Sequence, residues 1–286
     1  MIRHLPVLFI LFFFFSSISF SSGNDPSGND SLNNNSVHAT AFQLIKYDIS
    51  KGIDDGLDII QAPANFSAED WAITGVIVSG TALSMLLDNN LRNVAGRNHT
   101  AGMDNITKIG KYYGEVIPAV SLSAGLYTAG LVFNVRSVSL TGRLLAESLL
   151  YAGTINILLK FLFSRSRPYN NKGNTDFGNY NFNNDYYSLP SGHTTVAFTV
   201  STVLSERINN IYATIGLYGL ASLTAYQRIY SDNHWLSDTV LGAAIGTVIG
   251  RAVVKLNESD PYECNGPDIS LLPVRNGFVL GINFRF

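Results

Sequence analysis

The stretch from Lys160 to Asp238 decides the architecture of this chain, and three short blocks mark it: KFLFSRSRP at 160–168, PSGH at 190–193 and RIYSDNHWLSD at 228–238. Each block lies where an apolar run begins or ends. The runs are long enough for helices, so we expect the blocks at helix ends. Antiparallel packing of successive helices brings those ends together at one end of a bundle. The rest of the chain is then scaffold for the blocks.

The blocks combine the residue types that hold and attack a tetrahedral oxyanion. Arg offers a planar fork that donates two parallel hydrogen bonds to a phosphate, and Lys offers a compact charge. Ser191 and Gly192 come just before the apolar run 194–204. That position predicts a helix N-terminus, where free N–H groups favour a bound anion. The blocks therefore predict an anion site with a positive potential.

His234 and Asp238 stand four residues apart at the start of the apolar run 236–254. On a helix this spacing puts the carboxylate on the same face as the imidazole ring. A carboxylate bonded to one ring nitrogen fixes the tautomer and leaves the other nitrogen free to attack. Taken alone, such a pair is usually only a structural hydrogen bond, and Arg-Pro is usually only a helix stop. It is the three blocks together that favour catalysis.

With these spacings the blocks resemble the motifs of the type 2 phosphatidic acid phosphatase (PAP2) family, whose superfamily also includes bacterial acid phosphatases and vanadium-dependent haloperoxidases. The resemblance covers about residues 69–255. It implies that His234 takes the phosphoryl group, that Asp238 supports His234 and that His193 protonates the leaving oxygen. The phosphate-binding residues that it implies are Lys160, Arg167, Ser191, Gly192 and Arg228. It implies no metal and no cofactor.

One position departs from the family pattern. Gln227 stands before Arg228, where the family usually has Ser. Because the Gln amide also donates hydrogen bonds, we expect altered phosphate binding at this position rather than loss of activity.

Composition restricts the possible partners. The 286 residues are 46% hydrophobic and 14% charged, with a formal net charge of -2. This balance argues against a nucleic-acid partner and against a disordered chain. The expected partners are a phosphorylated lipid or a small phosphoester, together with membrane lipids, and the oligomeric state is left open.

The pattern predicts an all-α, six-helix bundle of the PAP2 type over 69–255, followed by a small C-terminal β-hairpin within 256–286. The six apolar runs are 71–87, 115–133, 139–163, 194–204, 210–229 and 236–254, and 88–114 is expected to be a loop. Most of the runs approach the ~20 residues that cross a bilayer. They also contain polar residues, so a spanning bundle and an exported core resting on a membrane both fit.

The N-terminal part predicts export to the cell envelope. Residues 1–22 have the order of a signal peptide, 23–41 are expected to be a flexible linker, and 42–68 an amphipathic segment. A cleaved signal followed by three crossings would put the site in the cytoplasm, which conflicts with an exported phosphatase. At the other end, Asn276-Gly277 is a hairpin-turn signal, and the alternation after it fits a packed strand pair better than the closing strand of an outer-membrane barrel.

Together with these residues, the resemblance implies a metal-independent phosphatase that hydrolyses a lipid phosphate or polyprenyl pyrophosphate through a phosphohistidine. A periplasmic acid phosphatase acting on small phosphomonoesters is the alternative, and a haloperoxidase or a non-catalytic envelope protein is less favoured. The polar, aromatic loop 169–188 is interpreted either as a lid that recognises substrate or as a solvated connector.

Overall fold

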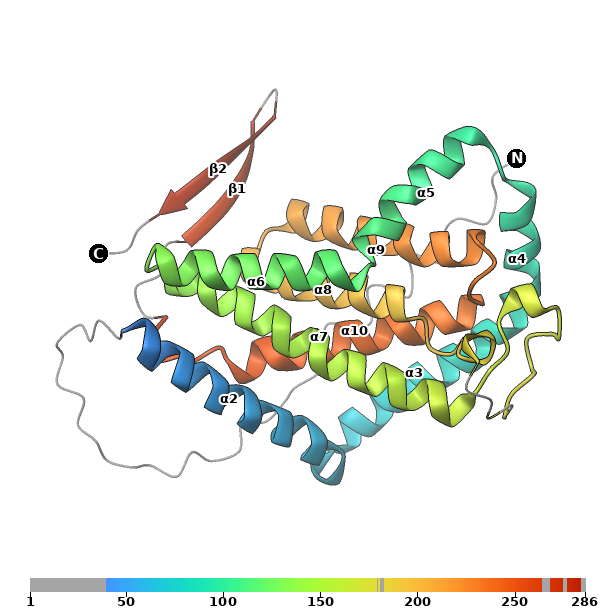
Figure 1. Cartoon of the computed structure of the whole chain (residues 1–286), viewed down its shortest axis with the longest axis horizontal. Helices are drawn as coiled ribbons and strands as arrows, with labels where there is room; N and C mark the ends of the chain where they lie inside the picture. Colours follow the sequence, from blue (N-terminus) through green and yellow to red (C-terminus); the bar gives the residue numbers. More distant parts are fainter. Residues whose placement is uncertain (1–39, 179, 181–182, 264–267, 275–276, 284–286) are drawn as a thin grey trace.

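Long helices packed side by side form most of this chain (Figure 1). The computed structural model describes residues 40–178, 180 and 183–263, and the backbone of 268–274 and 277–283. The predicted signal peptide and most of the predicted linker lie outside the described residues. The helices, in chain order, are α2 (Ala41–Gln61), α3 (Ala68–Ser84), α4 (Asp88–Arg97), α5 (Ala101–Tyr113), α6 (Val116–Val132), α7 (Arg136–Phe163), α8 (Gly192–Ile208), α9 (Ile211–Tyr230) and α10 (Leu236–Leu256).

Shorter elements join or follow these helices. The 3-10 turns are η2 (Ala62–Asn65), η3 (Met85–Leu87), η4 (Pro168–Asn170) and η5 (Asn184–Tyr186). After α10, strands β1 (Asp268–Val274) and β2 (Gly277–Asn283) pair antiparallel, with Leu271 opposite Leu280. The described part of the domain is therefore all-α, with one strand pair beyond it.

Each of the six predicted apolar runs lies in a helix, but the helical core has more helices than the six predicted. The segment 88–114, expected to be a loop, forms α4 and α5. Thr100 caps α5 by accepting a hydrogen bond from the Met103 N–H at 3.2 Å. A Cβ at Gly110 would lie 2.7 Å from the Leu223 carbonyl oxygen, so α5 packs backbone to backbone against α9. The cap and the backbone contact that support α5 do not require a long apolar run, so the apolar pattern did not indicate this helix.

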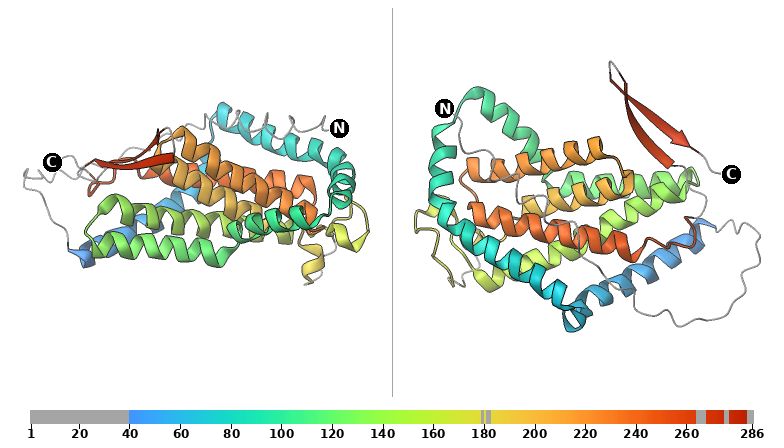
Figure 2. Two further views of the ribbon diagram at one scale, coloured as in Figure 1. Left: turned by 90° about the horizontal axis from the view of Figure 1, so that it is seen from above. Right: turned by 180° about the vertical axis from the view of Figure 1, so that it is seen from behind.

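The close approach of α10 to α8 places the two helix starts that carry the motif blocks next to each other. A Cβ at Gly242 would lie 2.6 Å from the Ser191 carbonyl oxygen, and one at Gly246 2.5 Å from the Thr195 carbonyl oxygen. Both distances are shorter than real Cβ contacts, so only glycine permits this packing. Around this pair the fully buried core contains Leu140, Leu144, Leu145, Val203 and Val253. Figure 2 shows α3 running along α10 on the outside of the bundle.

Helix α2 has its polar face turned inward. Arg136 holds Asp48 with two hydrogen bonds, Nη2 to Oδ1 at 2.7 Å and Nη1 to Oδ2 at 3.0 Å. Further along α2, the Asn257 amide donates to Asp55 Oδ2 at 2.6 Å. The exposed apolar residues of α2 include Phe42, Ile49, Ile53 and Ile60. Ion pairs and hydrogen bonds from its polar face, together with buried Leu44 and the partly buried Ile59, attach α2 to the bundle.

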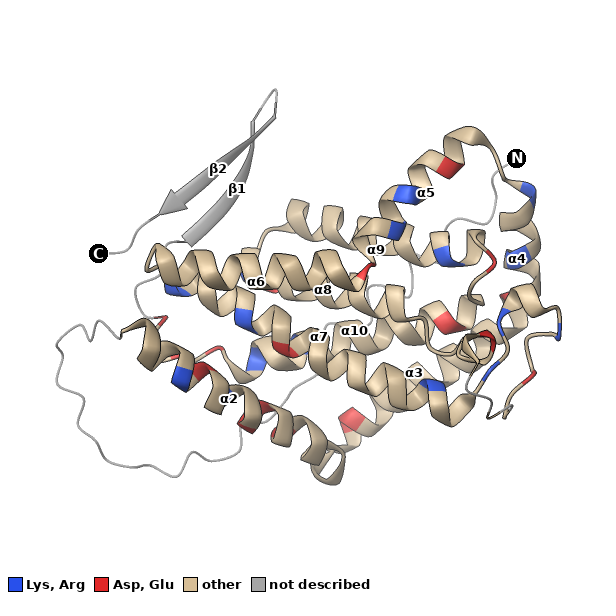
Figure 3. Ribbon diagram, in the orientation of Figure 1, with Lys and Arg blue, Asp and Glu red and all other residues tan. Residues whose placement is uncertain are grey.

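Three helical stretches are long and apolar enough to cross a membrane. They are Ala68–Arg97, Arg136–Asn170 and Leu236–Leu256. The pair α5 and α6, bent by 51°, adds a fourth if it is counted as one broken span. Helix α6 contains no Lys, Arg, Asp or Glu, which Figure 3 shows as an unbroken tan ribbon.

Candidate active site

The three motif blocks come together where α7 and α9 end and where α8 and α10 begin. Lys160 Nζ, near the end of α7, donates to the Pro190 carbonyl oxygen at 2.6 Å. The Ser191 N–H donates to the Asp238 carbonyl oxygen at 2.9 Å, which joins the starts of α8 and α10. The four helix ends therefore meet at one end of the bundle, as the block positions predicted.

Asp238 is the third residue of α10, and its carboxylate both caps the helix and contacts His234. Its Oδ2 accepts from the Trp235 N–H at 2.8 Å, which caps the helix, and lies 3.4 Å from His234 Nδ1. His234 itself precedes the helix, because Trp235 is the N-cap. Ser188 donates from its hydroxyl to the same Oδ2. The carboxylate thus orients the imidazole through Nδ1 and leaves Nε2 for other chemistry.

Burial keeps His234 neutral. Its side chain is 3% exposed, and this desolvation lowers the pKa of His234 well below the ordinary value, although the hydrogen bond to Asp238 opposes the shift. With Nδ1–H facing the carboxylate, the neutral ring carries its lone pair on Nε2. A neutral ring in this tautomer can act as a nucleophile at neutral pH.

Arg165, which the sequence analysis did not single out, forms ion pairs with both Asp88 and Asp238. It is fully buried and donates from Nη1 to Ser237 Oγ at 2.7 Å and to Asp238 Oδ1 at 2.7 Å. From Nη2 it donates to Asp88 Oδ2 at 2.7 Å. The only sequence signal for Arg165 was its position in the first block, where the Arg-Pro step singles out Arg167 instead.

The loop 169–188 supports two of the predicted phosphate-binding cations. Arg167 donates from Nε to the Asn184 carbonyl oxygen at 2.9 Å and from Nη2 to Asn184 Oδ1 at 3.0 Å. Lys160 Nζ donates to the Tyr187 carbonyl oxygen at 2.7 Å. The end of this loop therefore fixes the positions of Arg167 and Lys160.

Arg228 is a buried cation with an unused donor. Its side chain donates from Nη1 to Gln227 Oε1 at 3.2 Å, and its Nε has no hydrogen-bond partner among the described residues. Burial, followed by the nearby charge of Arg167, lowers the pKa of Arg228 to about 10. Gln227, the departure from the family pattern, thus accepts a hydrogen bond from Arg228. A buried guanidinium with a free donor is suited to bind an anion.

The start of α8 adds backbone donors and a second histidine. Ser191 is the N-cap, so the N–H groups that follow it have no acceptor within the helix. There is open space beside Gly192. A Cβ added to it would meet Asn156 Oδ1 at 3.7 Å, and no other described atom comes closer apart from the neighbouring residues of the same helix. Burial first, then the charges of Arg228 and Arg167, lower the pKa of His193 to about 4. His193 therefore lies at a helix start with free N–H donors and near the charges of Arg228 and Arg167.

Comparisons with known proteins agree with the motif blocks. Residues 141–260 match the family model described as PAP2 superfamily. The chain is 30% identical over 184 residues to the lipid A 1-phosphatase of Porphyromonas gingivalis, in an alignment that covers 61% of this chain and 36% of that protein. It is 27% identical over 119 residues to the lipid A 4'-phosphatase of the same organism, covering 41% of this chain and 50% of that protein. The chain thus spans half or less of the length of these relatives.

Two solved structures are also similar. Aquifex aeolicus LpxE shares 25% identity, with a TM-score of 0.48 over 59% of this chain and 95% of that chain. A transmembrane PAP2 type phosphatidylglycerolphosphate phosphatase from Bacillus subtilis shares 18% identity, with a TM-score of 0.49 over 74% of this chain and 96% of that chain. All three motif blocks, from Lys160 to Asp238, lie within the segment that the family model matches. Residues 141–260 therefore belong to the PAP2 superfamily.

Proposed function

We propose that this chain is a membrane-embedded phosphatase that hydrolyses a lipid phosphate through a phosphohistidine, without a metal. One observation supports the proposal most strongly, namely that the site contains two complementary groups. His234 is neutral and is oriented by the Asp238 carboxylate, and Arg228 is buried with an Nε that is unpaired among the described residues. A nucleophile and an anion-binding donor are the two groups that phosphoryl transfer from an ester requires.

In the first step, His234 Nε2 attacks phosphorus, and the bond between phosphorus and the leaving oxygen breaks. Protonated His193 gives its proton to that oxygen, so the lipid leaves as an alcohol. The pKa of about 4 in the unliganded protein leaves His193 mostly neutral at pH 7. The negative charge of a bound phosphate raises this pKa and supplies the acid form. Arg167, Arg228 and Lys160 stabilise the charge on the equatorial oxygens.

In the second step, water attacks the phosphohistidine. Neutral His193 takes a proton from the water as the new oxygen–phosphorus bond forms, and His234 leaves with its lone pair restored. Inorganic phosphate is released, and the two histidines are ready for another cycle. His193 thus acts as acid and then as base, which microscopic reversibility favours for a single well-placed group.

The substrate class follows from the surroundings of the site. Helices long and apolar enough to cross a bilayer carry the site at their ends, and both matched curated relatives are named lipid A phosphatases. We therefore favour a phosphorylated glycolipid over a polyprenyl pyrophosphate or a small phosphomonoester. The proposed location is the cell-envelope membrane, with residues 1–22 as the export signal.

Phosphate release by detergent-purified protein in EDTA tests this function. The substrates are a phosphorylated lipid A and a soluble aryl phosphate. The variants are His234→Ala and, as a control outside the site, Lys255→Ala. We expect release from the lipid by wild type and Lys255→Ala and none by His234→Ala. If the protein prefers the aryl ester, it is an acid phosphatase and the lipid assignment is wrong. If release needs added metal or persists in His234→Ala, the proposed mechanism is wrong.

A further inference from the structure

Helix α4 packs directly against the third motif block. Ala95 is buried in an apolar cluster with Ile229 and Leu236, which flank the turn between α9 and α10. The start of α4 is held by α10 as well, because Asp88 Oδ1 accepts a hydrogen bond from the Ser237 N–H at 2.9 Å. Apolar packing and a hydrogen bond therefore fix α4 beside the residues that carry the proposed nucleophile.

The turn between α9 and α10 determines where His234 lies relative to Arg228. This α9–α10 turn consists of residues 231–235 and contains His234. The N–H groups of Asn233 and His234 both donate to the Arg228 carbonyl oxygen, each at 3.1 Å. Asp232 has a left-handed backbone conformation, with a φ of 56°. Asp and Asn adopt this conformation more readily than most other residues with a side chain. The shape of the turn thus depends on Asp232.

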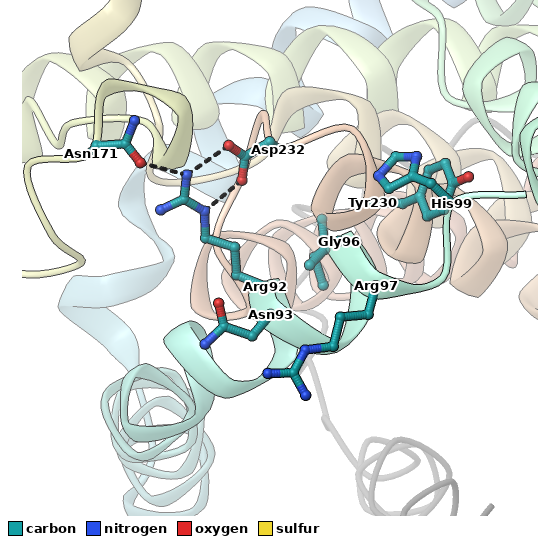
Figure 4. A pocket seen from close by; sticks show the side chains of 9 residues that line it. Arg92, Asn93, Gly96, Arg97, His99, Asn171, Tyr230 and Asp232 are labelled. Atoms are coloured by element: carbon teal, nitrogen blue, oxygen red, sulfur yellow. Dashed lines mark hydrogen bonds and ion pairs between the residues drawn. The ribbon is translucent and has the colours of Figure 1, made fainter.

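Arg92, in the middle of α4, holds this turn at two points. Figure 4 shows its guanidinium facing the Asp232 carboxylate. Arg92 donates from Nε to Asp232 Oδ1 at 2.6 Å and from Nη2 to Asp232 Oδ2 at 2.7 Å. The guanidinium also lies over the ring of Trp235, 5.5 Å from the centroid. Arg92 therefore contacts the residues on both sides of the pair Asn233-His234.

The same guanidinium reaches the turn that follows the first motif block. Arg92 donates from Nη2 to Asn171 Oδ1 at 2.9 Å. Asn171 closes η4, the short turn directly after Arg167. The Tyr169 N–H, within η4, donates to the Asp232 carbonyl oxygen at 3.3 Å. Arg92 thus lies where η4 meets the α9–α10 turn, and it binds a side chain from each.

These contacts are too exposed to contribute much to stability. The side chains of Arg92 and Asp232 are 25% and 39% exposed. Ion pairs with this exposure add little to the free energy of folding. Catalysis is far more sensitive to geometry, since a displacement of about 1 Å at a reacting group can cost about 10²-fold in rate. A contact that fixes the α9–α10 turn can therefore matter for turnover and hardly matter for folding.

We propose that Arg92 is a positioning residue for phosphoryl transfer, which holds His234 in line with a phosphate bound by Arg167 and Arg228. The inference rests on the proposed function, because it assigns a role in that reaction to a residue that acts through Asp232 and Trp235. Helix α4 lies outside residues 141–260, the segment that matches the family model. The role therefore goes beyond the three motif blocks.

The test measures kcat and KM of detergent-purified protein with a phosphorylated lipid A. Arg92→Met removes the fork and keeps an unbranched side chain. Arg97→Met makes the same change on the same helix, where Figure 4 shows Arg97 pointing away from Asp232 and Asn171. We expect Arg92→Met to lower kcat about tenfold or more with little change in KM. Its melting temperature should shift by no more than about 3 °C. Arg97→Met should behave as wild type.

Two further variants separate the fork from a general effect of charge. Lys keeps the charge but lacks the planar fork, so Arg92→Lys should stay impaired. If Arg92 acts through Asp232, adding Asp232→Asn to Arg92→Met should cause little further loss of kcat. Wild-type kcat in Arg92→Met or Arg92→Lys, or losses that multiply in the double variant, would overturn the positioning role. A kcat loss accompanied by a large fall in melting temperature would also overturn it.

A wild-type protein that releases no phosphate would mean that the proposed function has failed. Equilibrium binding of inorganic phosphate then tests the arrangement of the site without catalysis. Weaker phosphate binding by Arg92→Met than by Arg97→Met supports the positioning role. Equal binding by the two variants refutes it.

Discussion

Arg165 donates from Nη1 to Oδ1 of Asp238 over 2.7 Å, and neither side chain is exposed to solvent. The same guanidinium reaches Asp88 Oδ2 at 2.7 Å from Nη2. One arginine therefore binds the carboxylate at the start of α4 and the carboxylate that orients His234. The position of the proposed nucleophile depends on a cation that has no contact of its own with a substrate.

Replacing Arg165 by Met should destabilise the fold strongly. The substitution leaves two buried carboxylates without their cation, a change that costs about 3–5 kcal/mol when one partner of a buried pair is removed. Thermal unfolding in detergent measures the effect. The control is Arg207→Met, which removes an arginine from the more exposed pair with Glu263 and should cost about 1 kcal/mol or less. Equal losses in the two variants would contradict the central role of Arg165.

Arg228→Met should separate stability from activity. The wild-type protein buries a guanidinium whose Nε has no partner in the part of the chain that the structure describes. An apolar side chain of similar length should therefore leave the melting temperature unchanged or raise it. The same variant should lose about 10²–10³-fold in kcat, because a donor to the transferring phosphate is gone. A fall in melting temperature together with wild-type turnover would show that Arg228 is structural.

Acid should destabilise the protein through His193. The folded pKa of His193 is about 4, below the ordinary value near 6.5, so between these pH values the unfolded chain binds more protons than the folded one. The stabilisation is complete above pH 6.5 and is lost as the pH falls toward 4. The melting temperature of His193→Gln, compared with wild type from pH 7.5 to 4.5, should fall less steeply. Parallel curves would mean that His193 is not desolvated.

Asp48→Asn should loosen α2 and leave catalysis intact. The substitution removes the charge that pairs with Arg136 and Arg143, far from the site. From Arg136 to Lys160, α7 rises about 36 Å at 1.5 Å per residue. Trypsin should cleave the variant faster after Lys51, while phosphate release stays at the wild-type rate. Unchanged cleavage would show that the ion pair does not hold α2.

The sequence predicted those parts of the fold whose signal is local. Apolar runs predicted the positions of the long helices. The spacing of His234 and Asp238 predicted that the two side chains lie close together, although His234 precedes α10 instead of sharing a helix face with Asp238. The network around Arg165 was not predictable, because Asp88 lies 77 residues away and no periodicity links the two. The pattern of residues 42–68 predicts an amphipathic segment, and that pattern alone assigns the apolar face to a core. The buried arginines on α7 reverse that orientation, and only the packed structure reveals them.

Covalent trapping tests the central claim most directly. Protein mixed with a lipid substrate labelled with ³²P in the phosphate is quenched in alkali within milliseconds, and the labelled peptide is identified by mass spectrometry. The account predicts an acid-labile, alkali-stable phosphohistidine at His234 that forms in EDTA and is absent from His234→Ala. Label on another residue, or full turnover by a His234→Ala protein, would contradict it.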